Sequence, residues 1–129
     1  MPLVTISFTE GVYSDEQQRA LADSIHSALV SALGVPETDR FQRLIPLKKQ
    51  QLIIDSSYPS LSKPRTVGFV LVEVLLSVGR SVKLKKLFLK TVVDNLQKHP
   101  GVDPDDVMIV LVETAWENWA FSAGVQIHV

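Results

Sequence analysis

The sequence contains no cysteine. This absence excludes disulfides, a thiol nucleophile and every zinc or iron–sulfur site that uses cysteine, and it suits a reducing cytoplasm, where we expect the protein to act. The sequence also lacks an excess of charge of either sign, because 13 basic and 14 acidic side chains leave a net charge of −1. A chain without an overall field does not recruit nucleic acid or anionic lipid. We therefore expect neither nucleic acid nor membranes among its partners.

Long hydrophobic runs are missing as well. The longest apolar stretch, residues 67–76, is interrupted by Glu73 and is far shorter than the roughly 20 residues that cross a bilayer. The first residues lack both the basic and the apolar region of a secretion signal. With 129 residues, of which 46% are hydrophobic, the sequence predicts a single globular domain over residues 1–129.

The familiar catalytic signatures are absent. The chain has no glycine-rich nucleotide loop, no serine hydrolase elbow and no HExxH motif. Its three histidines, His26, His99 and His128, do not have the spacing of metal ligands, and we predict no metal and no organic cofactor. His26 falls on the polar side of a predicted helix, where we expect it to be solvated.

The first third of the chain predicts a strand, a helix and a second strand. Residues 4–9 alternate apolar and polar side chains, which is typical of a strand with one buried face. Ser14 and Gln17 have the spacing of a capping box, and Gly34 ends the helix that begins there. The apolar side chains at helical spacing are Leu21, Ile25, Ala28, Leu29 and Ala32. Residues 41–47 form a possible strand that Pro46 confines to a sheet edge.

The rest of the chain repeats this order after a long loop over residues 48–65, which is rich in turn formers. Residues 67–76 are almost continuously apolar and predict a strand covered on both faces. A helix capped by Ser81 follows, and residues 107–112 predict another buried strand. In that helix we expect Leu84, Leu87, Phe88, Val92 and Leu96 to be buried, and Lys83, Lys85, Lys86 and Lys90 to be solvated.

The two halves follow one plan, with repeats at about residues 2–47 and 67–113. The segment from Gly34 to Asp39 matches the segment from Gly101 to Asp106, a separation of about 67 residues. Two tandem β-α-β units make a sheet whose two helices cover only one face. The other face then has to be covered by another chain, so the sequence predicts an oligomer.

Pro2 is a candidate for chemistry because it becomes the N-terminal residue if Met1 is removed. A free proline nitrogen is a secondary amine, and an α-amino group titrates near pH 8. Burial or a neighbouring cation lowers the pKa of such an amine, and a neighbouring carboxylate raises it. The same amine can therefore serve as a general base or as a general acid near neutral pH.

Several short segments together resemble the tautomerase superfamily. They are Pro2 at the head of a strand, the Glu10-Gly11 turn before Ser14, and the Gly79-Arg80-Ser81 turn that opens the second helix. Gly34-Val35-Pro36, Asp39-Arg40-Phe41-Gln42 and Asn118-Trp119-Ala120-Phe121 are similar to its malonate semialdehyde decarboxylase branch. The resemblance implies an α/β fold of two β-α-β units about a pseudo-twofold axis, with one mixed sheet, two helices on one face, and assembly as a trimer.

The same resemblance assigns roles to six residues. Pro2 is the catalytic amine, Asp39 holds a proton or orients water, and Arg80 clamps a substrate carboxylate. Gln42, Trp119 and Phe121 contact the substrate, the two aromatic residues as an apolar wall. The position of Arg80 supports its role independently, because it lies between a strand end and a helix N-terminus, where an anion is favoured.

One turn departs from the decarboxylase pattern. Where that branch has Arg-Pro-Arg, this chain has Val78-Gly79-Arg80, so one of two clamp arginines is missing unless Arg43 or Arg65 replaces it. The loss of a cation affects decarboxylation more than enolisation.

The sequence leaves three hypotheses open. The first is a cofactor-free enzyme in which Pro2 moves a proton during keto-enol tautomerisation of a small oxo acid. The second is decarboxylation of malonate semialdehyde, or hydration of a related unsaturated acid. The third is a trimeric protein without activity, because retention of Met1 would make the Pro2 nitrogen an amide with no useful basicity.

Overall fold

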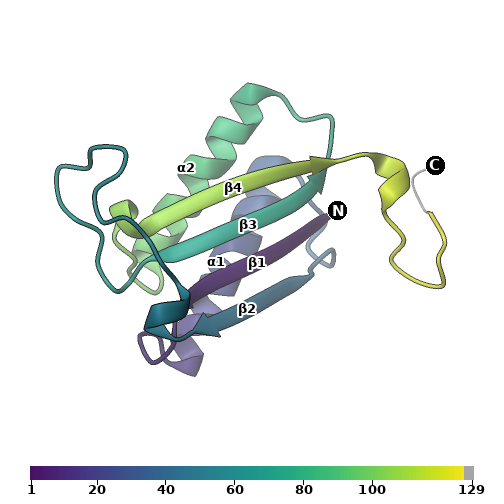
Figure 1. Ribbon diagram of the computed structural model, residues 1–129. Helices are drawn as coiled ribbons and strands as arrows, with labels where there is room; N and C mark the ends of the chain where they lie inside the picture. The colour runs from purple at the N-terminus through teal and green to yellow at the C-terminus, as the bar shows by residue number, and fades with distance from the viewer. Residues whose placement is uncertain (127–129) are drawn as a thin grey trace.

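The computed structural model describes residues 1–126 as a four-stranded sheet with two helices on one face (Figure 1). The elements are β1 (Pro2–Thr9), α1 (Asp15–Leu33), β2 (Gln42–Leu47), β3 (Val70–Ser77), α2 (Val82–Lys98) and β4 (Val107–Thr114), with short 3-10 helices η1 (Lys49–Gln51), η2 (Pro104–Asp106) and η3 (Trp116–Asn118). Both predicted helices and all four predicted strands are confirmed.

The sheet is mixed, with the strand order β2-β1-β3-β4. In each half the two strands are parallel and joined through a helix, whereas the halves meet through antiparallel β1 and β3. The predicted pair of β-α-β units is confirmed. Because β1 and β3 run in opposite directions, the start of each lies beside the end of the other, and Pro2 pairs with Leu76.

The repeat extends to the ends of the helices. Gly34 and Gly101 both have positive φ, 68° and 101°, which favours glycine after a helix. The next residue in each half, Val35 or Val102, turns back into the core, and its amide bonds a carbonyl of the preceding helix. The capping box predicted for Ser14 and Gln17 is present.

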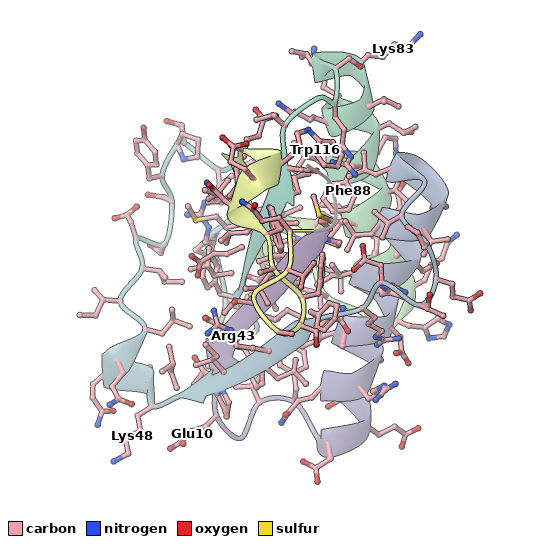
Figure 2. The ribbon with its side chains drawn as sticks, turned by 90° about the vertical axis from the view of Figure 1, so that its right-hand side faces the viewer. Glu10, Arg43, Lys48, Lys83, Phe88 and Trp116 are labelled. Carbon is pink, nitrogen blue, oxygen red and sulfur yellow. The ribbon has the colours of Figure 1, made fainter. Side chains whose placement is uncertain are left out.

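The core lies between the sheet and the helices. It comprises Val4, Ile6 and Phe8 of β1, Val70, Val72, Val74 and Leu76 of β3, and Leu21, Ile25, Leu29, Phe88, Val92 and Leu96 of the helices. The other sheet face carries exposed apolar side chains, among them Met108, Val110 and Val112. In Figure 2 the helices lie on one side of the sheet and Arg43 on the other. Residues 67–76 are therefore not covered on both faces in the single chain, and residues 107–112 are not fully buried, because both helices pack on the same side. The strand also begins later, at Val70.

Three expectations about helix faces are wrong. His26 is buried rather than solvated, because it packs beneath the turn that follows α1. In α2, Leu84 and Leu87 are exposed, since the buried stripe is confined to Phe88, Val92 and Leu96. Lys85 is only partly solvated, with a side chain that is 24% exposed, because it forms an ion pair with Glu113 in which Nζ lies 2.8 Å from Oε1.

The remaining segments agree with the sequence. β2 is an edge strand that contains Pro46, and residues 48–69 form a long loop with one short 3-10 helix. His99 is exposed and His128 lies outside the described residues. No helix within residues 1–126 is long and apolar enough to cross a membrane.

Candidate active site

The topology brings Pro2, Asp39 and Arg80 to one end of the sheet. Pro2 begins β1 and pairs with Leu76 near the end of β3. Leu76 lies three residues before the Gly79-Arg80-Ser81 turn, so this pairing places Pro2 near Arg80. Asp39 precedes β2, which runs parallel to β1 and therefore starts at the same end. In Figure 1 this end also receives the C-terminal segment that follows β4.

The N-terminus of the folded chain is enclosed at this end. Met1 is 7% exposed, and its ammonium nitrogen lies 2.8 Å from Oδ2 of Asp39, whose side chain is 17% exposed. The turn that holds Asp39 is fixed by its amide, which donates to the Pro36 carbonyl (3.0 Å), and by His26, whose Nε2 lies 2.7 Å from the Glu37 carbonyl oxygen. An amine at the start of β1 is thus held in a protected position beside a carboxylate.

Arg80 lies on the other side of this enclosure. Its Nη1 donates a hydrogen bond to the carbonyl of Ser77 (3.1 Å), and the residues described provide no other partner for its guanidinium. Ser81 caps α2 by accepting a bond from the Leu84 amide, and the first turn of α2 has no acidic residue. The positive end of the helix dipole and a guanidinium with free donors therefore meet at one point, which favours an anion.

Aromatic side chains close the site on the side of the C-terminal segment. Trp119 stacks on Phe121, with 5.9 Å between ring centroids, and Phe121 packs on Phe41 at 5.5 Å. The Trp119 indole donates to Thr114 Oγ1 (2.5 Å), and this hydroxyl donates to the carbonyl of Leu76, the partner of Pro2 (3.2 Å). The predicted apolar wall of Trp119 and Phe121 thus adjoins the end of β3.

Gln42 is not brought to the other predicted site residues. Its Nε2 donates to the Ala22 carbonyl (2.8 Å), and its Oε1 accepts from Nε of Arg40 (2.8 Å), so the amide is turned towards α1. Arg40 also bonds Asp23, and this hydrogen bond lowers the pKa of Asp23. The cation next to Asp39 in the sequence is therefore directed away from it.

Neither candidate for a second clamp arginine lies beside Arg80. Arg43, the second residue of β2, lies on the open sheet face and donates to the Thr5 hydroxyl at 2.9 and 3.2 Å. Arg65 lies at the opposite end of the sheet, where it bonds the Asp55 carbonyl and lies 6.0 Å from the Phe69 ring. The chain itself thus places one arginine at the site.

Sequence reasoning missed three residues at this end of the sheet. Ser77 is fully buried at the end of β3, Thr114 links β4 to Trp119, and Phe41 completes the aromatic cluster. A usable signal existed for Ser77, because it is a hydroxyl residue that ends a mostly apolar strand just before the Gly79-Arg80 turn. Thr114 and Phe41 are ordinary strand-end residues, and only the fold shows their place.

Two models of protein families match the chain, and both are described as tautomerase enzymes. One covers residues 39–122 and the other residues 2–45. Together they cover both repeats, and the first alone covers more than half of the chain.

Individual proteins agree with this result. The chain is 28% identical to the probable tautomerase YusQ of Bacillus subtilis (strain 168), over 96% of this chain and 95% of YusQ. The crystal structure of FG41 malonate semialdehyde decarboxylase inhibited by 3-bromopropiolate is 31% identical, with a TM-score of 0.88 over 96% of this chain and 92% of that one. A fused 4-OT symmetric trimer shares the fold, with 21% identity and a TM-score of 0.78 over 96% and 94% of the two chains.

Proposed function

The chain belongs to the tautomerase superfamily of enzymes, and from this premise we propose that it catalyses keto-enol tautomerisation of a small oxo acid without a cofactor. The observation that carries the proposal is the enclosed start of β1, where an ammonium nitrogen lies 2.8 Å from the Asp39 carboxylate. In the active protein Met1 is removed and Pro2 provides the nitrogen.

In this reaction the Pro2 amine moves a proton between carbon and oxygen. The neutral amine removes a proton from the carbon next to the oxo group, and protonated Pro2 then gives this proton to the enolate oxygen, which yields the enol and the neutral amine. In the reverse direction, protonated Pro2 returns a proton to carbon while the enol oxygen loses its own. Asp39 stabilises the cationic form of Pro2, because its carboxylate lies 2.8 Å from the ammonium of Met1, the terminal position that the Pro2 amine takes over.

The other groups bind and shield the substrate. Arg80 bonds the substrate carboxylate through donors that no described residue uses, aided by the N-terminus of α2. Trp119 and Phe121 exclude water and so strengthen these charge interactions. Gln42 would need to exchange both of its present hydrogen bonds to take part, and we assign it no contact.

Decarboxylation of malonate semialdehyde is the second candidate, and it is favoured by the likeness to the FG41 decarboxylase. The substrate would lose carbon dioxide, and the carbon left behind would take a proton from Pro2. Hydration of an unsaturated acid belongs to the same candidate, with Asp39 orienting the water. Weighing against both is Val78, which stands where the second arginine of that branch would be. Asp39→Asn separates the candidates, because enol ketonisation should continue at a reduced rate, whereas decarboxylation or hydration should be abolished.

The test begins with the intact mass of untagged protein expressed from its own start codon. Loss of one methionine leaves Pro2 free, and ketonisation of 2-oxo acid enols and decarboxylation of malonate semialdehyde are then assayed on the same sample. Pro2→Gly, which replaces the secondary amine by a primary one, should lower the rate strongly. Full retention of Met1 would overturn the mechanism and favour a protein without activity.

We also propose that the active species is a homotrimer that acts in the cytoplasm. Support for an oligomer comes from the exposed apolar side chains on the open sheet face, such as Met108, Val110 and Val112. Size-exclusion chromatography with light scattering should give three times the chain mass of 14.3 kDa. Met108→Glu should dissociate the assembly, and a monomeric wild-type protein would contradict the proposal.

A further inference from the structure

Three buried side-chain polar atoms have no hydrogen-bond partner among residues 1–126: His26 Nδ1, Asp39 Oδ1 and Ser77 Oγ. A buried polar atom without a partner is unfavourable, and in a native protein it calls for an explanation. Two of the three atoms lie at the same end of the sheet, at the start of β1. That clustering points to a common occupant.

The strand register defines where the two atoms lie relative to the N-terminus. Pro2 pairs with Leu76, so the antiparallel register continues with Met1 opposite Ser77. On its other side, Met1 contacts Asp39 through the ion pair of 2.8 Å. The space filled by Met1 is therefore bounded by the carboxylate of Asp39 on one side and the end of β3 at Ser77 on the other.

The hydroxyl of Ser77 has no hydrogen-bond partner among the described residues, whereas the polar groups around it do. The Ser77 carbonyl accepts from Arg80, and the adjacent hydroxyl of Thr114 is engaged with Leu76 and Trp119. Ser77 itself is 1% exposed, so bulk water does not reach its side chain. A hydroxyl that is buried, has no partner among residues 1–126 and belongs to the residue whose carbonyl Arg80 bonds is free to donate to a ligand.

We propose that Ser77 is a substrate-contacting residue, whose hydroxyl donates a hydrogen bond to the oxo oxygen of a 2-oxo monocarboxylate bound by Arg80. This inference rests on the proposed function and extends it. As the amine removes a proton from carbon, negative charge grows on the oxo oxygen, and a fixed donor stabilises that charge. One arginine and one hydroxyl fit a substrate with a single carboxylate beside an oxo group.

A binding experiment tests this assignment separately from catalysis. Protein that has lost Met1 is titrated by calorimetry with pyruvate and with propionate, which lacks the oxo oxygen. We expect wild-type protein to prefer pyruvate by about five- to tenfold, the effect of one hydrogen bond. In Ser77→Ala this preference should disappear while propionate affinity stays unchanged, and Ser77→Cys, a weak donor, should fall between.

The kinetic counterpart uses ketonisation of the enol of phenylpyruvate. Ser77→Ala should lower kcat by about 10- to 100-fold with little change in KM, because the hydrogen bond strengthens in the transition state. Ser24→Ala is the matched control, since the Ser24 hydroxyl is also buried but bonds the His99 carbonyl (2.7 Å). It should lower the melting temperature and leave kcat unchanged, whereas Ser77→Ala should melt no lower than wild type.

The outcomes are distinguishable. An unchanged pyruvate preference and an unchanged kcat in Ser77→Ala would overturn the assignment while leaving the tautomerase proposal intact. A wild-type protein that lacks Met1 and yet neither binds pyruvate nor turns over the enol would overturn both. A lower melting temperature in Ser77→Ala, with the pyruvate preference retained, would make the hydroxyl a structural group and contradict the proposal.

Discussion

The two ends of the sheet share one plan but use it differently. A shift of 67 residues, the separation of Gly34 from Gly101, relates the two halves of the chain. It matches Pro2 with Phe69, Asp39 with Asp106, Arg80 with Tyr13, and Ser81 with Ser14. Each end of the sheet therefore has three corresponding positions. The first is the start of a strand, the second is an acidic residue in the turn before the neighbouring strand, and the third is the residue that precedes a helix cap.

At the end that begins with Phe69, the polar groups bond one another. Both oxygens of Asp106 accept from Thr66, one from its amide (2.8 Å) and one from its hydroxyl (2.5 Å). Tyr13 donates to the carbonyl of Gly68 (2.5 Å), and Phe69 is buried. Acidic side chains in the first turn of α1, Asp15 and Glu16, already complement its dipole.

At the end that begins with Pro2, the corresponding groups keep unused bonding capacity. One oxygen of Asp39 and the hydroxyl of Ser77 have no partner among the described residues, and the first turn of α2 has no acid. Arg80 contacts a single carbonyl. The comparison teaches that the same local geometry stabilises the fold where its polar groups are paired and suits a ligand where they are not.

The largest difference between the two ends should appear in activity. Arg80→Gln removes the charge that binds the substrate carboxylate, and we expect kcat/KM for enol ketonisation to fall by about 100- to 1000-fold. Tyr13→Phe, the matched change at the other end, should alter kcat/KM by less than about threefold, because its hydroxyl bonds the chain itself. Equal losses in the two variants would remove the functional distinction between the ends.

Stability should show the opposite order. Asp106→Asn replaces a buried carboxylate that accepts two bonds from Thr66, and we expect the free energy of unfolding to fall by about 2 kcal/mol. Asp39→Asn should lower it by less, about 1 kcal/mol, since only one of its oxygens has a partner, the amine at the start of β1. Urea denaturation of both variants measures this difference, and a reversed order would contradict the comparison.

A smaller effect should come from His26, which bonds the turn that carries Asp39. The matching turn of the second half is fixed instead by Asp103, whose side chain accepts from the Asp105 amide. We expect His26→Leu to lower kcat about tenfold by displacing Asp39, with little change in KM. His26→Gln keeps an N–H donor and should restore most of the rate.

If His26→Gln and His26→Leu lose kcat equally, the bond to the Glu37 carbonyl does not position Asp39. The melting temperatures of both variants, measured on the same samples, separate this outcome from simple unfolding.

The smallest effect concerns alkaline pH. Burial, together with the negative charge of Asp106, raises the pKa of Tyr13 to about 12 from its ordinary value of 10. The folded protein thus holds this proton more tightly than the unfolded chain, so the associated stability is complete below pH 10 and is lost as the pH rises towards 12. Tyr13→Phe should flatten this part of the stability curve, measured by urea denaturation at pH 9 and 11. An unchanged slope would mean that Tyr13 does not titrate differently in the two states.

The sequence predicted most of the fold because local patterns determine it. Alternation marked β1, the Ser14 cap and Gly34 bounded α1, and the matching glycine turns revealed the repeat. The errors arose where tertiary packing decides burial. His26 falls on the polar side of its helix, yet the turn after the helix covers it. Leu84 falls on the apolar side of its helix, yet it extends beyond the core and is exposed.

The candidate site was predictable only in part. The roles of Pro2, Asp39 and Arg80 were predicted from the resemblance to the tautomerase superfamily, and the strand pairing places these three residues at one end of the sheet. Gln42 forms two hydrogen bonds, and the Ser77 hydroxyl has no partner among the described residues. Both facts depend on how the side chains are oriented. Spacing along the chain contains no information about that orientation.

The burial of Met1 sets an order of events during synthesis. An aminopeptidase must take the first residue into its own active site, and it cannot reach Met1 once β1 has docked. The strand that encloses it ends at Ser77 and leaves the ribosome long after the N-terminus. At about 5–20 residues per second, roughly 4–15 s pass before Leu76 is made. Under the proposed function, Met1 therefore has to be removed within this interval, before β3 pairs with β1, so the position of β3 in the chain limits the time in which the proline amine can be released.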